Sequence, residues 1–246
     1  MTLRVRGLLV VACLTVIVAL LATFPARVAY SWVSPPFVRI SGIDGTIWNG
    51  SARSFSTHGV YLTDLSWTMR PLRLLTGTAL FEVSGSPVAG FFESEVAVSF
   101  GGAITLRDLR ASLPLQMFES AANIAGLRGS ASLQFERLEL VEGRPAAMDG
   151  TLDIANLVVP VVAGASLGGY RAEFFTQNNG IVASVEDTDG VVDLAGSLQL
   201  RNDKTYAFLG QIAAKPNTPE QVSRQLRFLP PGNGQGQHEL RLEGSY

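Results

Sequence analysis

The sequence predicts a mainly β protein, with a single N-terminal transmembrane helix followed by a curved, mostly antiparallel β-sheet meander and one or two short helices. Three observations predict it. Residues 8–24 form an uncharged apolar run. Apolar and polar residues alternate through much of the remaining chain, and 25 glycines recur, several beside Asn or Asp as in tight turns. We divide the chain into a stub and anchor at 1–33 and a β-rich domain at 34–246.

The N-terminal apolar run, LLVVACLTVIVALLATF, has the composition of a membrane-spanning helix. A helix over residues 8–24 would be about 25 Å long, at the short end of what crosses a hydrocarbon core of about 30 Å. Arg4 and Arg6 precede the run, whereas only Arg27 follows it closely. Because positive charge stays on the cytoplasmic side, we expect a cytoplasmic N-terminus and a body on the opposite face of the membrane.

A cleaved signal peptide is the alternative interpretation of this run. Cleavage needs small residues at the first and third positions before the cut. A cut after Ala26 would place Phe at the third position, and a cut after Ala29 would place Arg there. We therefore expect an uncleaved anchor, with Tyr30 and Trp32 in the aromatic belt of the membrane interface.

The overall composition argues against several functional classes. Charged residues make up 16% of the chain, against a usual share of about 25%. The formal net charge of −2 provides no basic field for nucleic acid. Cys13 is the only cysteine and lies in the apolar run, so neither an intramolecular disulfide nor a zinc knuckle is available.

The strand patterns are specific enough to place turns and irregularities. Apolar residues at Tyr61, Leu65, Trp67 and Met69 predict one face of a strand. The apolar phase shifts near Glu136-Arg137, which predicts a β-bulge.

Asp187–Gly190 resembles the start of a calcium loop, but the twelfth position holds Leu instead of Glu. We therefore expect a hairpin turn there.

Helix signals are few. Residues 71–75 could form one turn, and residues 114–125 a short amphipathic helix. The segment 218–229 is a stronger case, because Thr218 suits an N-cap position and Gln221 would complete a capping box. This last helix could dock another subunit or cap an open end of the sheet.

No constellation of catalytic residues emerges from the sequence. The two histidines, His58 and His238, have no metal-ligand pattern around them. Carboxylates are scattered singly, and no nucleophile or nucleotide-binding motif is present. We predict no catalytic, cofactor-binding or metal-binding residue and no enzymatic activity.

Three segments together carry a family resemblance. Val38–Gly50 contains the run G-x-x-G-T-x-W-x-G, Leu65–Gly77 reads LSWTMRPLRLLTG, and Leu226–Gly232 precedes a final strand. In this order, with a single anchor before them, they make the chain similar to the type II secretion system protein N (general secretion pathway protein N) family. The resemblance covers nearly the whole chain.

The resemblance implies a place in the cell and a role. It implies a cell inner membrane protein, single-pass through residues 8–24, with a periplasmic body that acts as an accessory component of the type II secretion machine, which exports folded proteins through the outer membrane. The implied partners are other secretion components, with no cofactor. The body is also similar to AsmA-like half-pipe sheets. That likeness implies the alternative of an envelope protein that handles lipid on its apolar face.

The motif residues are the candidate interaction residues. They are Gly42, Gly45, Thr46, Trp48, Gly50, Trp67 and Pro71. The tryptophans could anchor a partner, since Trp is enriched in interface hot spots, or could pack in the core. The glycines could shape a binding loop or serve the backbone alone.

Overall fold

In the computed structural model, the described residues are 13, 15–33, 38–57, 60–86, 90–178, 180–232 and 236–245. The strands in chain order are β1 (Val38–Ser41), β2 (Asp44–Gly45), β3 (Asn49–Thr57), β4 (Val60–Arg70), β5 (Thr78–Gly85), β6 (Phe91–Ser99) and β7 (Ile104–Pro114). They continue as β8 (Arg128–Val141), β9 (Arg144–Val158), β10 (Tyr170–Gln177), β11 (Gly180–Asp187), β12 (Val192–Arg201), β13 (Thr205–Ala214) and β14 (Gln237–Ser245). The short helices are α2 (Ala26–Val33), the 3-10 turns η1 (Pro71–Thr76) and η2 (Leu115–Phe118), α3 (Glu119–Ala122) and α4 (Glu220–Leu226).

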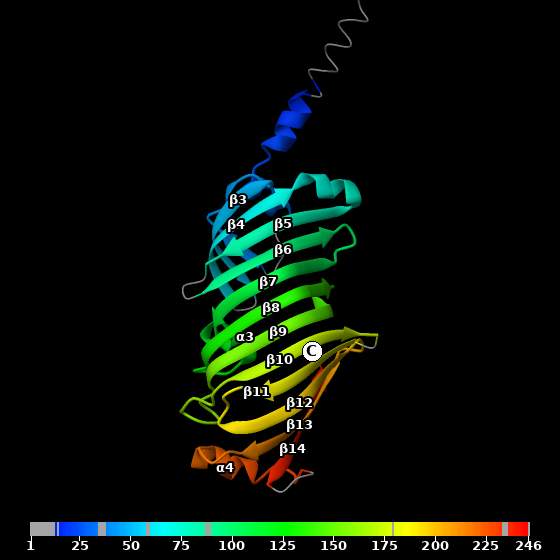
Figure 1. Cartoon of the computed structure of the whole chain (residues 1–246). Helices are drawn as coiled ribbons and strands as arrows, with labels where there is room; N and C mark the ends of the chain where they lie inside the picture. Colours follow the sequence, from blue (N-terminus) through cyan, green and yellow to red (C-terminus); the bar gives the residue numbers. More distant parts are fainter. Residues whose placement is uncertain are drawn as a thin grey trace, which may run out of the picture.

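The described strands form one fourteen-stranded sheet with a simple connectivity. Each strand from β3 onward pairs antiparallel with the next strand along the chain, and both β1 and β2 pair with β3. Figure 1 shows the strands stacked as successive rungs, with β14 at the end of the sheet opposite to the N-terminal helix. The predicted mainly β, antiparallel meander with few short helices is confirmed.

The sheet is curved, and one face lies inside the curve. Leu62 on β4, Phe135 on β8 and Ile181 on β11 belong to one buried cluster, although these strands are far apart in the sheet order. The short segment η2 contacts both β4 and β8, which are four positions apart in the sheet order, so the sheet bends toward this face. We call the face that carries these side chains the inner face.

The opposite, outer face is polar. Cross-strand pairing places Arg110, Gln134, Thr151, Glu173 and Ser184 in one row across five consecutive strands. This alternation of apolar inner and polar outer residues is what an antiparallel sheet with one solvated face requires.

Two strand irregularities bear on the sequence predictions. The pairing of β8 with β9 shifts between Phe135 and Arg137, so the predicted bulge is confirmed. The predicted face of β4 is wrong at its start, because Tyr61 is 51% exposed and Leu62 is buried instead. Asp64, between Leu62 and Leu65, has a φ of 51°. This left-handed residue rotates the strand so that the inner face passes from Leu65 to Leu62.

The short helices lie in the segments predicted from the sequence, but their bounds and caps differ from the prediction. Residues 71–76 form a 3-10 turn, and the segment predicted as one helix at 114–125 forms the two short pieces η2 and α3. The predicted capping box is wrong, because Pro219 occupies the N-cap of α4 and makes no side-chain cap. The Thr218 hydroxyl instead donates to the Val191 carbonyl and accepts from the Lys215 amide.

The N-terminal segment is helical at residues 15–22, and each of these residues is exposed. Within the described residues, no helix has both the length and the apolarity needed to cross a membrane. Residues 8–12 and 14 of the expected span, as well as Arg4, Arg6 and His58, lie outside the described residues. The transmembrane anchor therefore stays a prediction.

Candidate interaction sites

The first candidate site is the junction between the N-terminal helix and the sheet, where the sequence motif lies. The Trp48 indole Nε1 donates to the Leu21 carbonyl at 2.7 Å, and the Ile47 amide donates to the Phe24 carbonyl at 3.1 Å. Pro25 and Thr46 form an isolated β-bridge. The short connection after the helix is therefore fixed to the motif loop by backbone and side-chain bonds.

Trp67 organises the same loop from the β4 side. Its Nε1 donates to the Thr46 carbonyl at 3.2 Å, and its ring lies across β3 at Gly50. A Cβ at position 50 would stand 2.4 Å from the Trp67 ring and 2.6 Å from the Asp44 carbonyl oxygen. Gly50 therefore lets the ring approach the backbone.

The other motif residues act on the backbone. Gly42 and Gly45 have φ values of 66° and 84°, in the left-handed region that favours glycine. The Thr46 hydroxyl accepts hydrogen bonds from the Trp48 and Asn49 amides. Pro71 begins η1 at its first position. The structure thus brings six of the candidates to the junction and places Pro71 at the start of the neighbouring turn.

An apolar hollow of about 420 Å³ lies at this end of the molecule, on the inner face. Helix α2 contributes Ala26, Ala29 and Tyr30, and the sheet contributes side chains that include Phe55 and Trp67. Ala26 is buried, so α2 covers the mouth of the curved sheet.

The hollow does not continue along the sheet. Phe135 and Phe174 meet in the middle of the inner face, with ring centroids 5.6 Å apart, and Ile181 beside them is 1% exposed. Met117 and Phe118 pack against the same cluster. Within the described residues, the sheet is filled by its own side chains and does not form a continuous apolar channel.

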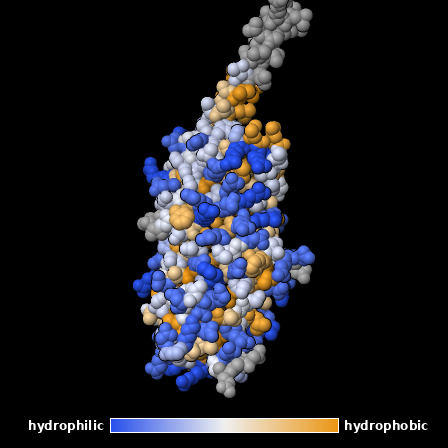
Figure 2. Space-filling model, viewed as in Figure 1, coloured by the Kyte–Doolittle hydropathy of each residue, from blue (hydrophilic) through white to orange (hydrophobic). Residues whose placement is uncertain are grey.

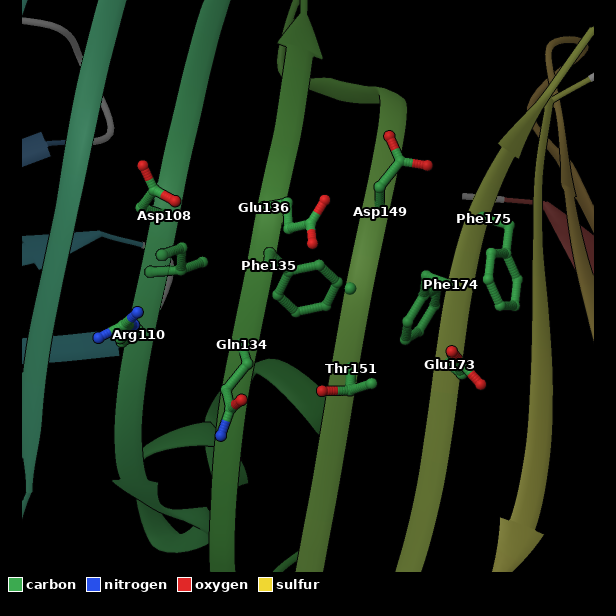
Figure 3. Close-up of a pocket in the computed structure, with 12 residues that line it drawn as sticks. Asp108, Arg110, Gln134, Phe135, Glu136, Asp149, Thr151, Glu173, Phe174 and Phe175 are labelled. Atoms are coloured by element: carbon green, nitrogen blue, oxygen red, sulfur yellow. The ribbon is translucent and has the colours of Figure 1, made fainter.

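A more polar hollow of about 670 Å³ lies over β7–β10 (Figure 3). The carboxylates of Asp108, Glu136, Asp149 and Glu173 line it together with a single cation, Arg110. Asp149 is engaged structurally, since its Oδ1 accepts the Thr176 amide at 2.8 Å. Among the described residues no group of His, Cys, Asp and Glu side chains is arranged to hold a metal ion.

The two outer edges of the sheet differ. At β1, the Tyr30 hydroxyl accepts the outward Ile40 amide at 3.2 Å and donates to the outward Val38 carbonyl at 2.9 Å. β1 has only four residues, and this one side chain occupies half of the outward amides and carbonyls of Val38 and Ile40. The β1 edge is therefore short and partly closed.

The β14 edge is half closed and half open. The Glu239 amide donates to the Pro230 carbonyl, and the Gly232 amide donates to the Gln237 carbonyl, so odd-numbered residues direct their backbone groups outward. The register with β13 continues without a shift through Ser245. Arg241 and Glu243 therefore direct their amides and carbonyls outward, and no described segment pairs with them.

Sequence reasoning missed both edge features. The pattern around Tyr30 predicted a residue of the membrane interface, and nothing local indicates that its hydroxyl closes a strand that begins eight residues later. Strand β14 was expected, but which of its backbone groups are free depends on the pairing of residues 230–232 with 237–239. Alternation of Leu240 and Leu242 with charged residues was the only available signal of its faces.

Comparison with known proteins supports the resemblance noted in the sequence. A family model described as type II secretion system (T2SS), protein N, matches residues 36–241. A type II secretion system protein N from Aeromonas hydrophila is 25% identical over 233 residues, covering 92% of each chain. One from Vibrio cholerae serotype O1 is 26% identical over 229 residues, covering 89% of this chain and 90% of the relative.

A third relative, the type II secretion system protein N of Pectobacterium carotovorum, is 21% identical over 233 residues and covers 89% of each chain. No solved structure matches this chain at a significant level.

Proposed function

Because the chain belongs to the type II secretion system protein N family, we propose that it is an inner-membrane-anchored accessory component that supports export of folded proteins through the outer membrane. The helix at residues 15–22 would continue the anchor, and the sheet would stand in the periplasm. The chain is a component of the type II secretion system; its anchoring and its structural role are the parts proposed here.

The observation that carries the structural role is the position of the open edge. The sheet path from β1 to β14 has twelve inter-strand steps, which at about 4.8 Å each span roughly 60 Å along the sheet. Figure 1 shows the N-terminal helix at one end of this path and β14 at the other. The protein therefore carries a free strand edge away from the membrane that its anchor would occupy.

The open edge suits a strand from a different protein. Backbone groups at Arg241 and Glu243 can pair with an added strand, a mode known as β-augmentation. A second copy that paired through its own β14 would make one continuous sheet of twice the length. The N-terminal helices of the two copies would then lie at its opposite ends. Two such copies could not share one membrane, so we assign the edge to another secretion component.

Deletion of this chain in its native host tests the proposal. We expect reduced export of a type II substrate, measured as substrate in the medium against substrate retained in the periplasm. Affinity purification of the full-length chain in mild detergent should recover other type II components. Normal export together with no recovered component would overturn the proposal.

The lipid-handling alternative receives less support from the geometry. It requires a continuous apolar lining, whereas Phe135, Phe174 and Ile181 fill the middle of the inner face. Purification of the chain without bound phospholipid, measured by mass spectrometry, is the result that we expect.

A further inference from the structure

Three large apolar side chains are almost fully exposed on one small region of the body. Leu72, Leu75 and Phe100 are 79%, 86% and 80% exposed. Leu72 and Leu75 are three residues apart in η1, so a 3-10 turn places them one above the other. Figure 2 shows apolar surface over η1, beside the N-terminal helix.

Backbone hydrogen bonds hold this region, although no residue of η1 is buried. Gly77 ends the turn in the left-handed conformation, with its amide bonded to the Arg73 and Leu74 carbonyls. The Phe100 amide donates to the Gly77 carbonyl at 3.4 Å, and the Phe100 ring lies 3.7 Å from the position of a Cβ on Gly77. Phe100 therefore adjoins η1 and extends its apolar surface.

A short series of contacts fixes this surface close to the N-terminal helix. The Leu21 carbonyl, near the end of that helix, accepts the Trp48 indole N–H. The Trp48 carbonyl accepts the Met69 amide at 2.7 Å, and Met69 lies two residues before η1. A bilayer that surrounds the helix therefore has this end of the body against its surface.

The charges nearby suit a lipid surface. The Arg73 side chain lies between the exposed leucines in sequence and joins none of the ion pairs formed by the described residues. A guanidinium on a flexible stem can reach anionic headgroups while neighbouring apolar side chains enter the interface. Trp32 on α2, 75% exposed, lies at the same end.

We propose that η1 and Phe100 form a second membrane contact, in which Leu72, Leu75 and Phe100 insert into the interface of an anionic bilayer and fix the orientation of the body. This inference depends on the proposed anchoring. A helix alone would allow the body to tilt and rotate, whereas two contacts hold the long axis of the sheet away from the membrane. The open β14 edge is then presented in a defined direction.

Depth measurements on the full-length chain test the inference. With Cys13→Ser as background, single cysteines at Leu75, Val18 and Phe228 carry an environment-sensitive fluorophore in vesicles of phosphatidylethanolamine and phosphatidylglycerol. Phe228 is the matched control, because it is 89% exposed but adjoins α4 at the far end of the sheet. We expect lipid-attached nitroxides to quench the labels at 75 and 18, and not the label at 228.

Each remaining outcome is decisive. If the label at 75 behaves like the label at 228 while the label at 18 is quenched, the second contact is overturned and the anchor stands. If the label at 18 is also unquenched, the anchoring and the second contact fall together. A Leu72→Ser/Leu75→Ser variant with a label at Phe100 should lose quenching yet keep its β circular dichroism, since neither leucine is buried.

Discussion

At the scale of single residues, the glycines and tryptophans of the junction motif belong together, because the packing of Trp67 requires a residue without a side chain at position 50. Trp48 and Trp67 each donate the indole N–H to a backbone carbonyl, so the two rings reinforce the backbone pairing between the end of the helix and the motif loop. Gly50 makes the Trp67 position possible. The same residues that looked like partner anchors in the sequence are thus engaged within the chain.

Substitution of Gly50 tests this packing. Gly50→Ala should lower the free energy of unfolding by about 1–3 kcal/mol, because the new methyl group would overlap the Trp67 ring and the Asp44 carbonyl. Urea denaturation followed by tryptophan fluorescence measures it. Gly164→Ala is the control, since a Cβ at position 164 meets no atom within 4 Å. Equal stability of the two variants would contradict the packing argument.

Loss of the Trp48 indole N–H should loosen the junction without unfolding the sheet. In Trp48→Phe, one hydrogen bond of about 1 kcal/mol is removed from the Leu21 carbonyl. The Ile47 amide, bonded to Phe24, should then exchange its hydrogen about fivefold faster. Hydrogen-exchange mass spectrometry measures this, with the Phe174 amide in the middle of the sheet as the unchanged reference.

At the scale of elements, one ion pair holds the β11–β12 turn against the start of the α4 segment. The Lys215 ammonium pairs with the Asp187 carboxylate, whose side chain is 8% exposed, and also donates to the Gly190 carbonyl at 3.1 Å. The Leu194 amide donates to the other Asp187 oxygen at 2.8 Å. These contacts join two connections that are distant in sequence.

This pair predicts a specific dependence of stability on pH. Burial raises the pKa of Asp187, but the hydrogen bonds from Lys215 and Leu194, with the Lys215 charge, outweigh it and leave the pKa below its ordinary value. Because the pKa of Asp187 is lower in the folded chain than in the unfolded chain, its ionised carboxylate stabilises the fold at pH values above the unfolded pKa of about 3.9. That contribution is lost as the pH falls through the lower, folded pKa.

Lys215→Met should therefore remove about 1.5–3 kcal/mol of stability at neutral pH, the cost of a hydrogen bond to a charged group. It should also flatten the loss of stability on acidification below about pH 4, because Asp187 loses its cationic partner. Chemical denaturation across the acid range measures both effects. An unchanged acid slope in the variant would assign that slope to other carboxylates.

The strands and turns could be predicted where the apolar alternation and the turn residues lie within the segment itself. They could not be predicted where the backbone conformation of a single residue rotates the strand. The bulge beside Glu136 leaves a phase shift in the apolar pattern itself, so the sequence predicts it. The left-handed conformation of Asp64 leaves no such signal, and Tyr61 was assigned to the wrong face. Thr218 had the residue pattern of a cap but is bonded to Val191, a partner distant in sequence.

At the scale of the whole molecule, the antiparallel strand order could be predicted from the short connections between strands. The curvature of the sheet and the closure of its edges could not, because they depend on contacts between residues distant in sequence. The cluster that contains Leu62 and Ile181 extends across the inner face from β4 to β11, seven positions along the sheet order. Tyr30 partly closes one edge through its hydroxyl, and residues 230–232 close half of the other. Among the described residues, Arg241 and Glu243 thus form an open stretch of edge at the end of the sheet remote from the N-terminal helix.

The open stretch predicts how one backbone substitution should act in the cell. Glu243→Pro removes an outward amide that no described residue uses, so the sheet should keep its stability within about 1 kcal/mol, as proline does on edge strands. Pairing of a partner strand at this edge would lose a backbone donor, and export of a type II substrate should fall toward the level of the deletion strain. Secretion assays with matched expression levels measure this.

Glu243→Ala separates the backbone from the side chain. This variant loses the ion pair with Arg241 but keeps the outward amide. An exposed pair of this kind contributes about 0–1 kcal/mol, so export by Glu243→Ala should stay near that of the unmodified chain. If both variants secrete normally, no strand joins β14, and the contact with the secretion machine must be sought on the polar outer face. If both fail equally, the side chain and not the edge makes the contact.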